Sequence, residues 1–273
     1  MAVVPCACGG ALRGESMRIL VTNDDGVRSP GIRALAEALS TIAEVWIVAP
    51  DRERSAASHS ISLHRPLRIS KVDERVFSTD GTPSDCVYLA VNHLLQGNRP
   101  DFLASGINHG PNLADDITYS GTVAAALEGT MLGIPSVAFS LCLRGRSTEG
   151  MAASAQFARS FMAGLAQRHL APGILLNVNV PVGSDGASYR VTRQGKRAYG
   201  NEVIERTDPR GRRYYWVGGD ELAHENIPGS DANAVYDEGV ISVTPLHLNM
   251  TRDATREEMA SWQFPGTARR DHE

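Results

Sequence analysis

The sequence contains little cysteine, with only Cys6, Cys8, Cys86 and Cys142 among 273 residues and no C-x-x-C pair. The first two lie within the first ten residues, and the other two lie far apart in apolar, periodic segments. This distribution excludes a disulfide framework and indicates a reducing, cytoplasmic compartment. Cys6 and Cys8 would fit a metal clip, but two thiols without further ligands are weak support for one.

Long apolar runs and an excess of basic residues are also missing. No run approaches the roughly 20 apolar residues that span a membrane, so we expect no membrane partner. The formal net charge is -4 and the sequence pI is about 6.1. The basic footprint of a nucleic-acid binder is therefore absent, and we expect no binding to a nucleic-acid polymer. The composition, 42% hydrophobic and 21% charged, is that of an ordinary globular protein with a sizeable core.

Residues 1–16 (MAVVPCACGGALRGES) lack the basic stretch and the uninterrupted apolar core of a signal peptide. Met17 is followed at once by RILVT, which is typical of a strand. We expect residues 1–16 to be a disordered extension, or to result from an upstream start codon used in place of Met17.

Short apolar strands alternate with amphipathic helices from Met17 to about residue 182. The predicted strands are 18–22, 45–49, 102–105, 135–141 and 174–180, with two short strands within 61–79. The predicted helices are 29–40, one that begins at 82–85, 120–132 and 149–169. This alternation predicts an α/β fold with a mostly parallel sheet covered by helices on both faces. Ligands bind such a sheet at the carboxyl ends of its strands.

The pattern changes after Pro181. Residues 188–194 and 212–217 alternate apolar and polar side chains, and Asp208-Pro209-Arg210-Gly211 between strand-like runs suits a turn. We expect an antiparallel hairpin, one further strand at 240–246 and a short helix near 253–262. Residues 183–273 are therefore predicted to complete the domain as either a subdomain or an oligomerisation arm.

The first chemically informative loop is Asn23-Asp24-Asp25-Gly26, directly after the first strand. Two adjacent carboxylates at a buried strand end suit a hard cation such as Mg²⁺. An ordinary Asp-Gly turn would have the same sequence. The excess negative charge at this position favours the metal site.

Two further loops follow later strands. Residues 50–60 contain Ser55, whose hydroxyl is a candidate metal ligand, beside arginines that would attract phosphate. Residues 105–122 contain Asn108, whose amide oxygen is another candidate ligand. Ser120-Gly121-Thr122 opens the next helix, and helix N-termini bind phosphate, although Ser120 would also suit a plain N-cap. In a parallel sheet these loops meet at one edge.

Several sequence blocks together resemble the SurE (survival protein E) nucleotidases, in that family's order, from Met17 to about Leu246. The blocks are VTNDDGVRSPGIRALAEAL, VAPDRERSAASHS, GTPSDCVYLA, SGINHGPNLADDITYSGTVAAALEG, GIPSVAFS and VTPL. The resemblance implies a Rossmann-like three-layer sandwich. It also implies a phosphatase that removes phosphate from 5′- and 3′-nucleoside monophosphates with one divalent ion (Mg²⁺ or Mn²⁺, with Ca²⁺ also acceptable) and forms a homodimer or homotetramer.

The resemblance also assigns roles to residues of this sequence. Asp24, Asp25, Ser55 and Asn108 match the family's metal site, with Asp24 and Asp25 holding a metal-bound water for hydrolysis. Ser120, Gly121 and Thr122 match the segment near the bound phosphate. The region from about Tyr199 to Val217 matches arms that subunits exchange. The leader has no family counterpart, and the family varies at His109.

The general acid for the leaving alkoxide is not identified by the sequence, with His59, His109 and His247 as candidates. Covalent catalysis of the haloacid-dehalogenase type is rejected, because its nucleophile position would be Asn23 and an amide cannot serve. A dinucleotide-dependent oxidoreductase would need G-x-G-x-x-G after the first strand, which is absent. A non-catalytic nucleotide-binding regulatory protein on the same fold is the remaining alternative.

Overall fold

A computed structural model describes residues 16–143, 147–198, 203–217 and 223–265. Residues 1–15 of the predicted leader, with Cys6 and Cys8, and the first residues of the predicted arm (199–202) lie outside these ranges. Of the described cysteines, Cys86 is buried and Cys142 is half-buried, and both are free thiols.

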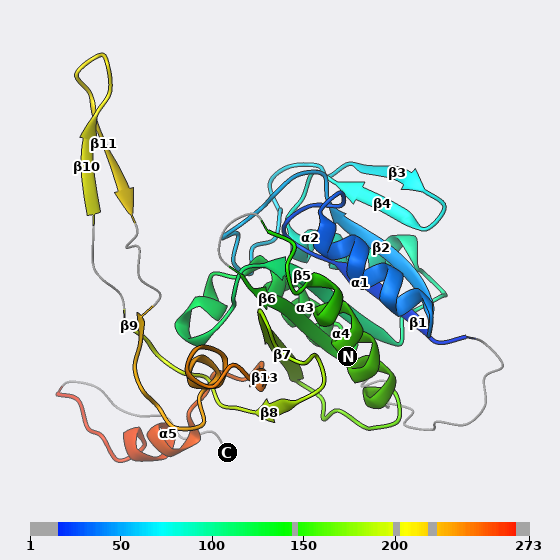
Figure 1. Cartoon of the computed structure of the whole chain (residues 1–273). Coiled ribbons are helices and arrows are strands. Elements are labelled where there is room, and N and C mark those ends of the chain that lie inside the picture. Colours follow the sequence, from blue (N-terminus) through cyan, green and yellow to red (C-terminus); the bar gives the residue numbers. More distant parts are fainter. Residues whose placement is uncertain (1–15, 144–146, 199–202, 218–222, 266–273) are drawn as a thin grey trace.

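A nine-stranded sheet forms the centre of the molecule (Figure 1). Its strands, in spatial order, are β3 (Ile69–Asp73), β4 (Val76–Thr79), β2 (Glu44–Pro50), β1 (Arg18–Thr22), β5 (Phe102–His109), β6 (Ser136–Cys142), β7 (Ile174–Pro181), β13 (Ile241–His247) and β8 (Tyr189–Val191). The six strands from β4 to β7 are mutually parallel, and β3 and β13 join them in antiparallel register. The α/β fold with a mostly parallel sheet is therefore confirmed.

Helices cover both faces of this sheet. One face carries α1 (Pro30–Ser40) and α4 (Met151–Leu165), and the other carries α2 (Pro83–Leu89) and α3 (Gly121–Met131). Shorter helical turns are η1 (Ala90–Leu94), η2 (Ala114–Thr118), η3 (Asn233–Asp237) and α5 (Asp253–Met259). In the described part of the chain, no helix is long and apolar enough to cross a membrane.

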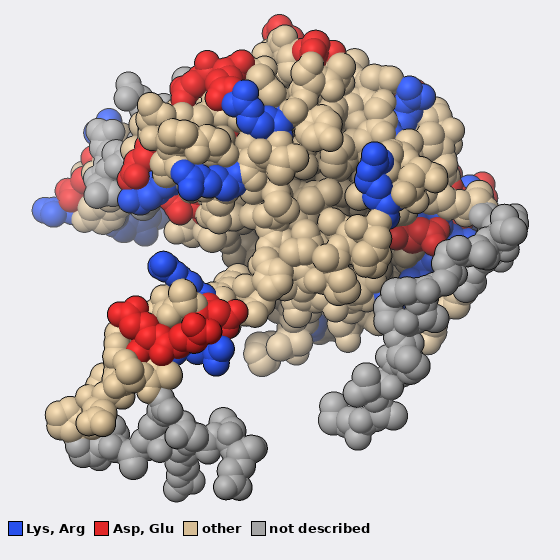
Figure 2. Space-filling model, turned by 90° about the horizontal axis from the view of Figure 1, so that it is seen from below, with Lys and Arg blue, Asp and Glu red and all other residues tan. Residues whose placement is uncertain are grey.

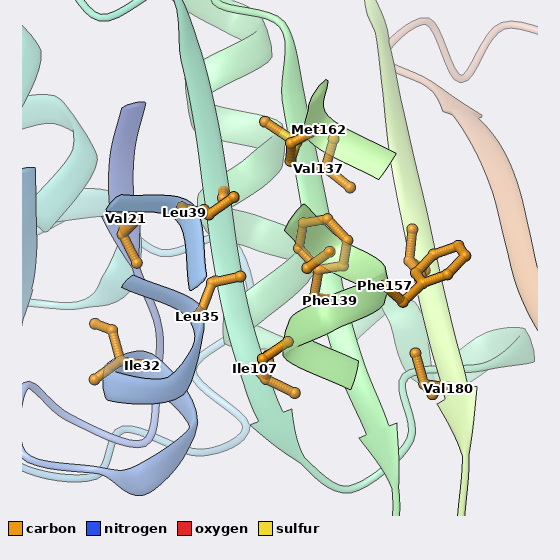
Figure 3. Close-up of a cluster of buried hydrophobic side chains, with 14 of the residues drawn as sticks. Val21, Ile32, Leu35, Leu39, Ile107, Val137, Phe139, Phe157, Met162 and Val180 are labelled. Carbon is orange, nitrogen blue, oxygen red and sulfur yellow. The ribbon is translucent and has the colours of Figure 1, made fainter. Parts of the chain in front are cut away.

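The larger core lies between the sheet and the α1–α4 layer. Ile32, Leu35 and Leu39 of α1 are fully buried there and pack with strand residues such as Phe139, as Figure 3 shows. Their spacing of three and four residues places them on one face of the helix. Burial of each such side chain contributes roughly 1.5–3 kcal/mol. This packing fixes the strand ends from which the site loops leave.

Local signals set where the helices begin. The Ser29 hydroxyl accepts a hydrogen bond from the Ile32 N–H at 3.4 Å, and Pro30 occupies the first turn of α1. Thr82 and Asp85 form a reciprocal capping box at the start of α2. Because these caps satisfy N–H groups that have no helical partner, they define the starts that the sequence predicts.

The prediction of an antiparallel hairpin was wrong for one of its two strands. The structure pairs β10 (Val203–Thr207) with β11 (Arg213–Val217) around the Asp208–Gly211 turn. The segment at 188–194 instead supplies β8, which joins the main sheet beside β13. Alternation of apolar and polar residues predicts strands but does not specify their partners. The hairpin extends away from the sheet (Figure 1), and β9 (Arg197–Ala198) pairs with β12 (Ala223–His224) at its base.

The two short strands predicted within residues 61–79 are present, whereas the strand predicted at 102–105 is longer than expected. Within residues 61–79, only β3 and β4 are regular, and residues 61–68 contain no strand. The strand predicted at 102–105 continues to His109 as β5, through Gly106. Gly106 has a φ of 135°, and a side chain there would meet the Phe139 carbonyl oxygen at 2.2 Å. Only glycine fits this close approach, which lets β5 carry Asn108 to the sheet edge.

Candidate metal and phosphate site

A cavity of about 700 Å³ opens at the carboxyl ends of the parallel strands. Loops after β1, β2, β5 and β6 and the start of α3 line it. Six candidate residues predicted from the sequence line this cavity: Asp24, Asp25, Ser55, Asn108, His109 and Ser120. The structure therefore brings together all four candidate metal ligands, although Asp24 and Asn108 lie 84 positions apart in the sequence.

The two carboxylates are held in different environments. Asp24 is 5% exposed, and its Oδ1 accepts a hydrogen bond from the Thr122 hydroxyl at 2.5 Å. Asp25 is less buried, and its Oδ2 accepts the His109 backbone N–H at 3.2 Å. The Asn23 amide closes the turn by bonding the Gly26 N–H and carbonyl. The Asn-Asp-Asp-Gly turn is therefore structured so that both carboxylates face the cavity while Asn23 faces inward.

Burial raises the pKa of both carboxyl groups. The pKa of Asp24 rises to about 6, because burial outweighs the hydrogen bond from Thr122 and the charge of Asp25 adds to the increase. The pKa of Asp25 is also raised by burial, with the His109 N–H opposing the shift and the charge of Glu53 adding to it. For both carboxylates the cost of burial therefore outweighs the favourable hydrogen bonds and charges around them.

Ser55 reaches the cavity on the loop that follows β2. The Arg54 backbone N–H donates to the Asp24 carbonyl at 2.7 Å, and the Arg54 guanidinium donates to the Asp80 carbonyl at 2.8 Å. Further along, the Ser58 N–H and hydroxyl donate to the carbonyls of Tyr119 and Thr118. Hydrogen bonds from Arg54 and Ser58 thus fix the loop on both sides of Ser55. The Ser55 hydroxyl itself donates to Glu53 at 2.7 Å.

Asn108 lies near the end of β5, one residue before His109. Its Nδ2 donates to the Gly110 carbonyl at 2.9 Å, which leaves the amide oxygen as the atom available to a ligand. Asn112 anchors the same loop to the sheet, because its side chain and backbone form hydrogen bonds with Ser140, Asn177 and Asn179 on β6 and β7. This buried amide network positions the loop that carries Asn108.

The three residues at the start of α3 have distinct environments. Ser120 caps the helix by accepting the Val123 N–H at 3.0 Å, and it lines the cavity. Gly121 and Thr122 lie against Asp24 and are not among the cavity-lining side chains. A side chain at Gly121 would meet the Asp24 Cβ at 2.8 Å. The contacts of Gly121 and Thr122 thus position Asp24.

The three histidine candidates separate clearly. His59 bonds the buried Glu128 of α3 at 2.8 Å, and His247 is exposed and bonds the Asn249 backbone. His109 lines the cavity, and its Nε2 lies 2.6 Å from the Ser147 carbonyl oxygen. Only His109 of the three is placed to meet a ligand in the cavity.

The cavity-lining residues that were not predicted as site residues include Glu53, Asp116, Tyr119 and Thr148. Glu53 and Tyr119 lie within the two loops, 50–60 and 105–122, that contain predicted ligands, so proximity in sequence was the available signal. Asp116 lies in η2 and forms an ion pair with Arg197, a contact across 81 residues that the sequence does not indicate.

The donor set fits a hard divalent cation. It combines two carboxylates, an amide oxygen and a hydroxyl, which are the oxygen ligands that Mg²⁺ and Mn²⁺ accept. No group of three or more His, Cys, Asp or Glu side chains suited to a metal occurs among the described residues. A cation at this cavity would therefore rely on neutral oxygens to complete its shell. The raised pKa values of Asp24 and Asp25 mark negative charge that a cation would stabilise.

Fold and site together define a class: a three-layer α/β protein with an acidic, oxygen-rich pocket at the carboxyl ends of its parallel strands. The sequence profile of the family "Survival protein SurE" matches residues 19–201. Proteins named 5′-nucleotidase SurE from Myxococcus xanthus and Geobacter metallireducens are 57% and 51% identical to this chain. The alignments cover 93% and 91% of this chain and 96% and 98% of those proteins.

A solved structure agrees with these sequence matches. The crystal structure of the SurE protein from Aquifex aeolicus superposes with a TM-score of 0.79 at 42% sequence identity. The match covers 89% of this chain and 98% of that one. This chain therefore belongs to the survival protein SurE family.

Proposed function

We propose that this protein is a 5′/3′-nucleotidase, which hydrolyses nucleoside monophosphates to nucleoside and phosphate. Relatives with more than half of their residues identical are named 5′-nucleotidase, which supports a hydrolase of this class. The observation that carries the site assignment is the single cavity that holds Asp24, Asp25, Ser55 and Asn108 beside the start of α3. No observation favours the alternative of a non-catalytic nucleotide-binding protein.

We assign Asp24, Asp25, Ser55 and Asn108 to one divalent ion, either Mg²⁺ or Mn²⁺. When bound, such an ion neutralises phosphate charge and makes a water molecule a better nucleophile at neutral pH. Thr122 and the His109 N–H hold the two carboxylates in place through the hydrogen bonds described above. No Lys or Arg side chain lines the cavity among the described residues, so the protein supplies few positive charges of its own.

We assign the segment Ser120-Gly121-Thr122 to the phosphate end of the substrate: Ser120 lines the cavity there, while Gly121 and Thr122 contact Asp24. The N-terminus of α3 directs its dipole and N–H groups into this region, which favours an anion. His109 is the candidate general acid for the leaving alkoxide, because it is the histidine among the three candidates that lines the cavity. Its imidazole would transfer a proton to the ester oxygen as that oxygen leaves.

Homodimeric or homotetrameric assembly and a cytoplasmic location are part of the same proposal. The β10–β11 hairpin supports assembly, since Tyr215 and Trp216 on it are 56% and 65% exposed. Exposed aromatic side chains on a projecting element are typical of an interface. On the face drawn in Figure 2, basic and acidic side chains lie in small separate groups, which is consistent with no binding to a nucleic-acid polymer.

Phosphate release from a panel of nucleoside monophosphates tests this function. The protein is stripped with EDTA, resupplied with Mg²⁺ or Mn²⁺, and compared with Asp25→Ala. We expect release that the metal restores and the variant lacks. A folded wild-type protein that releases no phosphate with any metal or nucleotide would require withdrawal of the proposed function.

A further inference from the structure

The Tyr119 ring stands on the wall of the cavity, one residue before the Ser120 cap of α3. Tyr119 is 60% exposed, while hydrogen bonds on both sides hold its backbone in place. The Tyr119 N–H donates to the Asp116 carbonyl at 3.0 Å, and the Tyr119 carbonyl accepts the Ser58 N–H at 3.1 Å. The chain therefore holds an aromatic ring at a defined place without burying it.

The cavity is larger than the metal ion and the phosphate group of the substrate require. Its volume of about 700 Å³ falls in the range of pockets that enclose a whole small organic ligand. The part assigned to metal and phosphate occupies the region of Asp24, Asp25 and the start of α3. Space therefore remains for the rest of the ester, and Tyr119 is among the residues that line the cavity.

The charges around this space favour a neutral group there. Asp24, Asp25, Glu53 and Asp116 all line the cavity, and no Lys or Arg of the described residues does so. A second anionic group on the substrate would therefore be repelled. Tyr119 is the one benzene ring on the described part of the wall, and it offers an apolar face to a flat, uncharged partner.

We propose that Tyr119 stacks on the nucleobase of the substrate and is the residue that selects nucleotides over other phosphate monoesters. This inference rests on the proposed nucleotidase function. Stacking of a base on an aromatic side chain contributes about 1–3 kcal/mol and tolerates every base. Because Tyr119 directly precedes the α3 cap, one short segment would hold phosphate at its helical end and the base at its aromatic end.

Kinetics with two substrates separate this role from a structural one. Tyr119→Ala, Tyr119→Leu and Tyr119→Phe are compared with wild type on adenosine 5′-monophosphate and on glycerol 2-phosphate, which has no ring. Tyr88→Ala is the matched control, because Tyr88 is 48% exposed on α2 and does not line the cavity. Thermal melting checks that each variant is folded.

For Tyr119→Ala we expect KM for the nucleotide to rise about 5- to 150-fold, with little change in kcat. Glycerol phosphate hydrolysis should change by less than about 2-fold. Phe should restore the nucleotide KM, whereas Leu, which fills space without a π-face, should not. Equal losses on both substrates, or an unchanged nucleotide KM, would overturn the stacking role.

Direct binding of adenosine, measured by calorimetry, separates this proposal from the proposed function. If wild type hydrolyses neither ester but binds adenosine, and Tyr119→Ala does not bind it, the base site stands and the nucleotidase function fails. If wild type hydrolyses the nucleotide and Tyr119→Ala binds adenosine as tightly as wild type, the base site fails alone.

Discussion

The proposed role of Asp24 as a metal ligand opposes its burial. A metal ligand must be ionised, yet Asp24 is 5% exposed and its neighbour Asp25 carries the same charge. Burial consequently raises its pKa to about 6 in the metal-free protein. Folding without metal therefore removes the Asp24 carboxylate from water while the adjacent Asp25 carries the same charge. The affinity for a cation is gained at the expense of stability in the metal-free state.

This conflict predicts a pH-dependent difference between wild type and Asp24→Asn. The folded protein binds the Asp24 proton more tightly than the unfolded chain does, so its contribution to stability is present below about pH 4. That contribution is lost as the pH rises from about 4 to 6. Asn keeps an oxygen acceptor for Thr122 and has no charge. In EDTA, we expect the variant to gain up to about 3 kcal/mol over wild type between pH 4 and pH 7.

Urea unfolding in EDTA at pH 4, 5, 6 and 7 measures this difference. The other carboxyl groups are common to both proteins and cancel in the comparison. Addition of Mn²⁺ should reverse the order, because only wild type binds the ion through Asp24 and is stabilised by it. A constant difference across this pH range would contradict the predicted role of burial.

At the scale of elements, the start of α3 controls the position of Asp24. A Cβ on Gly121 would lie 2.8 Å from the Asp24 Cβ and 2.9 Å from its Oδ2, so one of the two residues would have to move. We expect Gly121→Ala to lower kcat/KM about 100-fold, because a shift of about 1 Å in a reacting group has an effect of that size. Steady-state kinetics with a nucleoside monophosphate measure it.

Gly164 in α4 provides the matched control. A Cβ there would have only the Arg168 guanidinium within 4 Å, at 3.7 Å. Gly164→Ala should leave kcat/KM unchanged and raise the free energy of unfolding by roughly 0.5–1 kcal/mol, because alanine favours the helix. Equal kinetics for the two alanine variants would show that Gly121 does not position Asp24.

Sequence reasoning predicted the elements better than their contacts. The strands near 18–22 and 45–49 and the helices at 29–40 and 120–132 were predicted, because burial periodicity and caps are local signals. The grouping of Asp24, Asp25, Ser55 and Asn108 was also predictable, since parallel strands end at one edge. The partner of residues 188–194 was not, because pairing depends on a strand some fifty residues later.

At the scale of the whole molecule, the C-terminal part of the chain holds the pocket wall. Asp231 is fully buried and accepts backbone N–H groups from Ala114 at 2.9 Å and Gly195 at 2.8 Å. The Arg197 N–H donates to Asp115, and the Arg197 guanidinium pairs with Asp116. The base of the hairpin arm is thus joined to η2, which carries Asp116 and precedes Tyr119. Movement of the hairpin arm would therefore displace η2 and, with it, part of the cavity wall.

Loss of the Asp231 carboxylate should therefore affect both stability and substrate binding. Asp231→Ala leaves buried N–H groups without an acceptor, and we expect a decrease of about 2–4 kcal/mol in the free energy of unfolding. KM for a nucleotide should rise as η2 loosens. Asp237→Ala is the control, because Asp237 forms an exposed pair with His224, whose loss should change stability by less than about 1 kcal/mol. Urea unfolding and steady-state kinetics distinguish the two.

The placement of β13 between β7 and β8 also has a consequence for synthesis on the ribosome. β8 hydrogen-bonds to β13, which is translated some fifty residues later. The Ala114 N–H likewise donates to Asp231, which is translated 117 residues after it. A nascent chain that has just released β7 can already pair its six parallel strands with one another, although β7 still lacks its other neighbour, β13. The segment around Ala114 and η2, which forms part of the pocket wall, would still lack its hydrogen bond to Asp231. Catalytic competence would then arise only with the last quarter of the chain, after the sheet that supports it has formed.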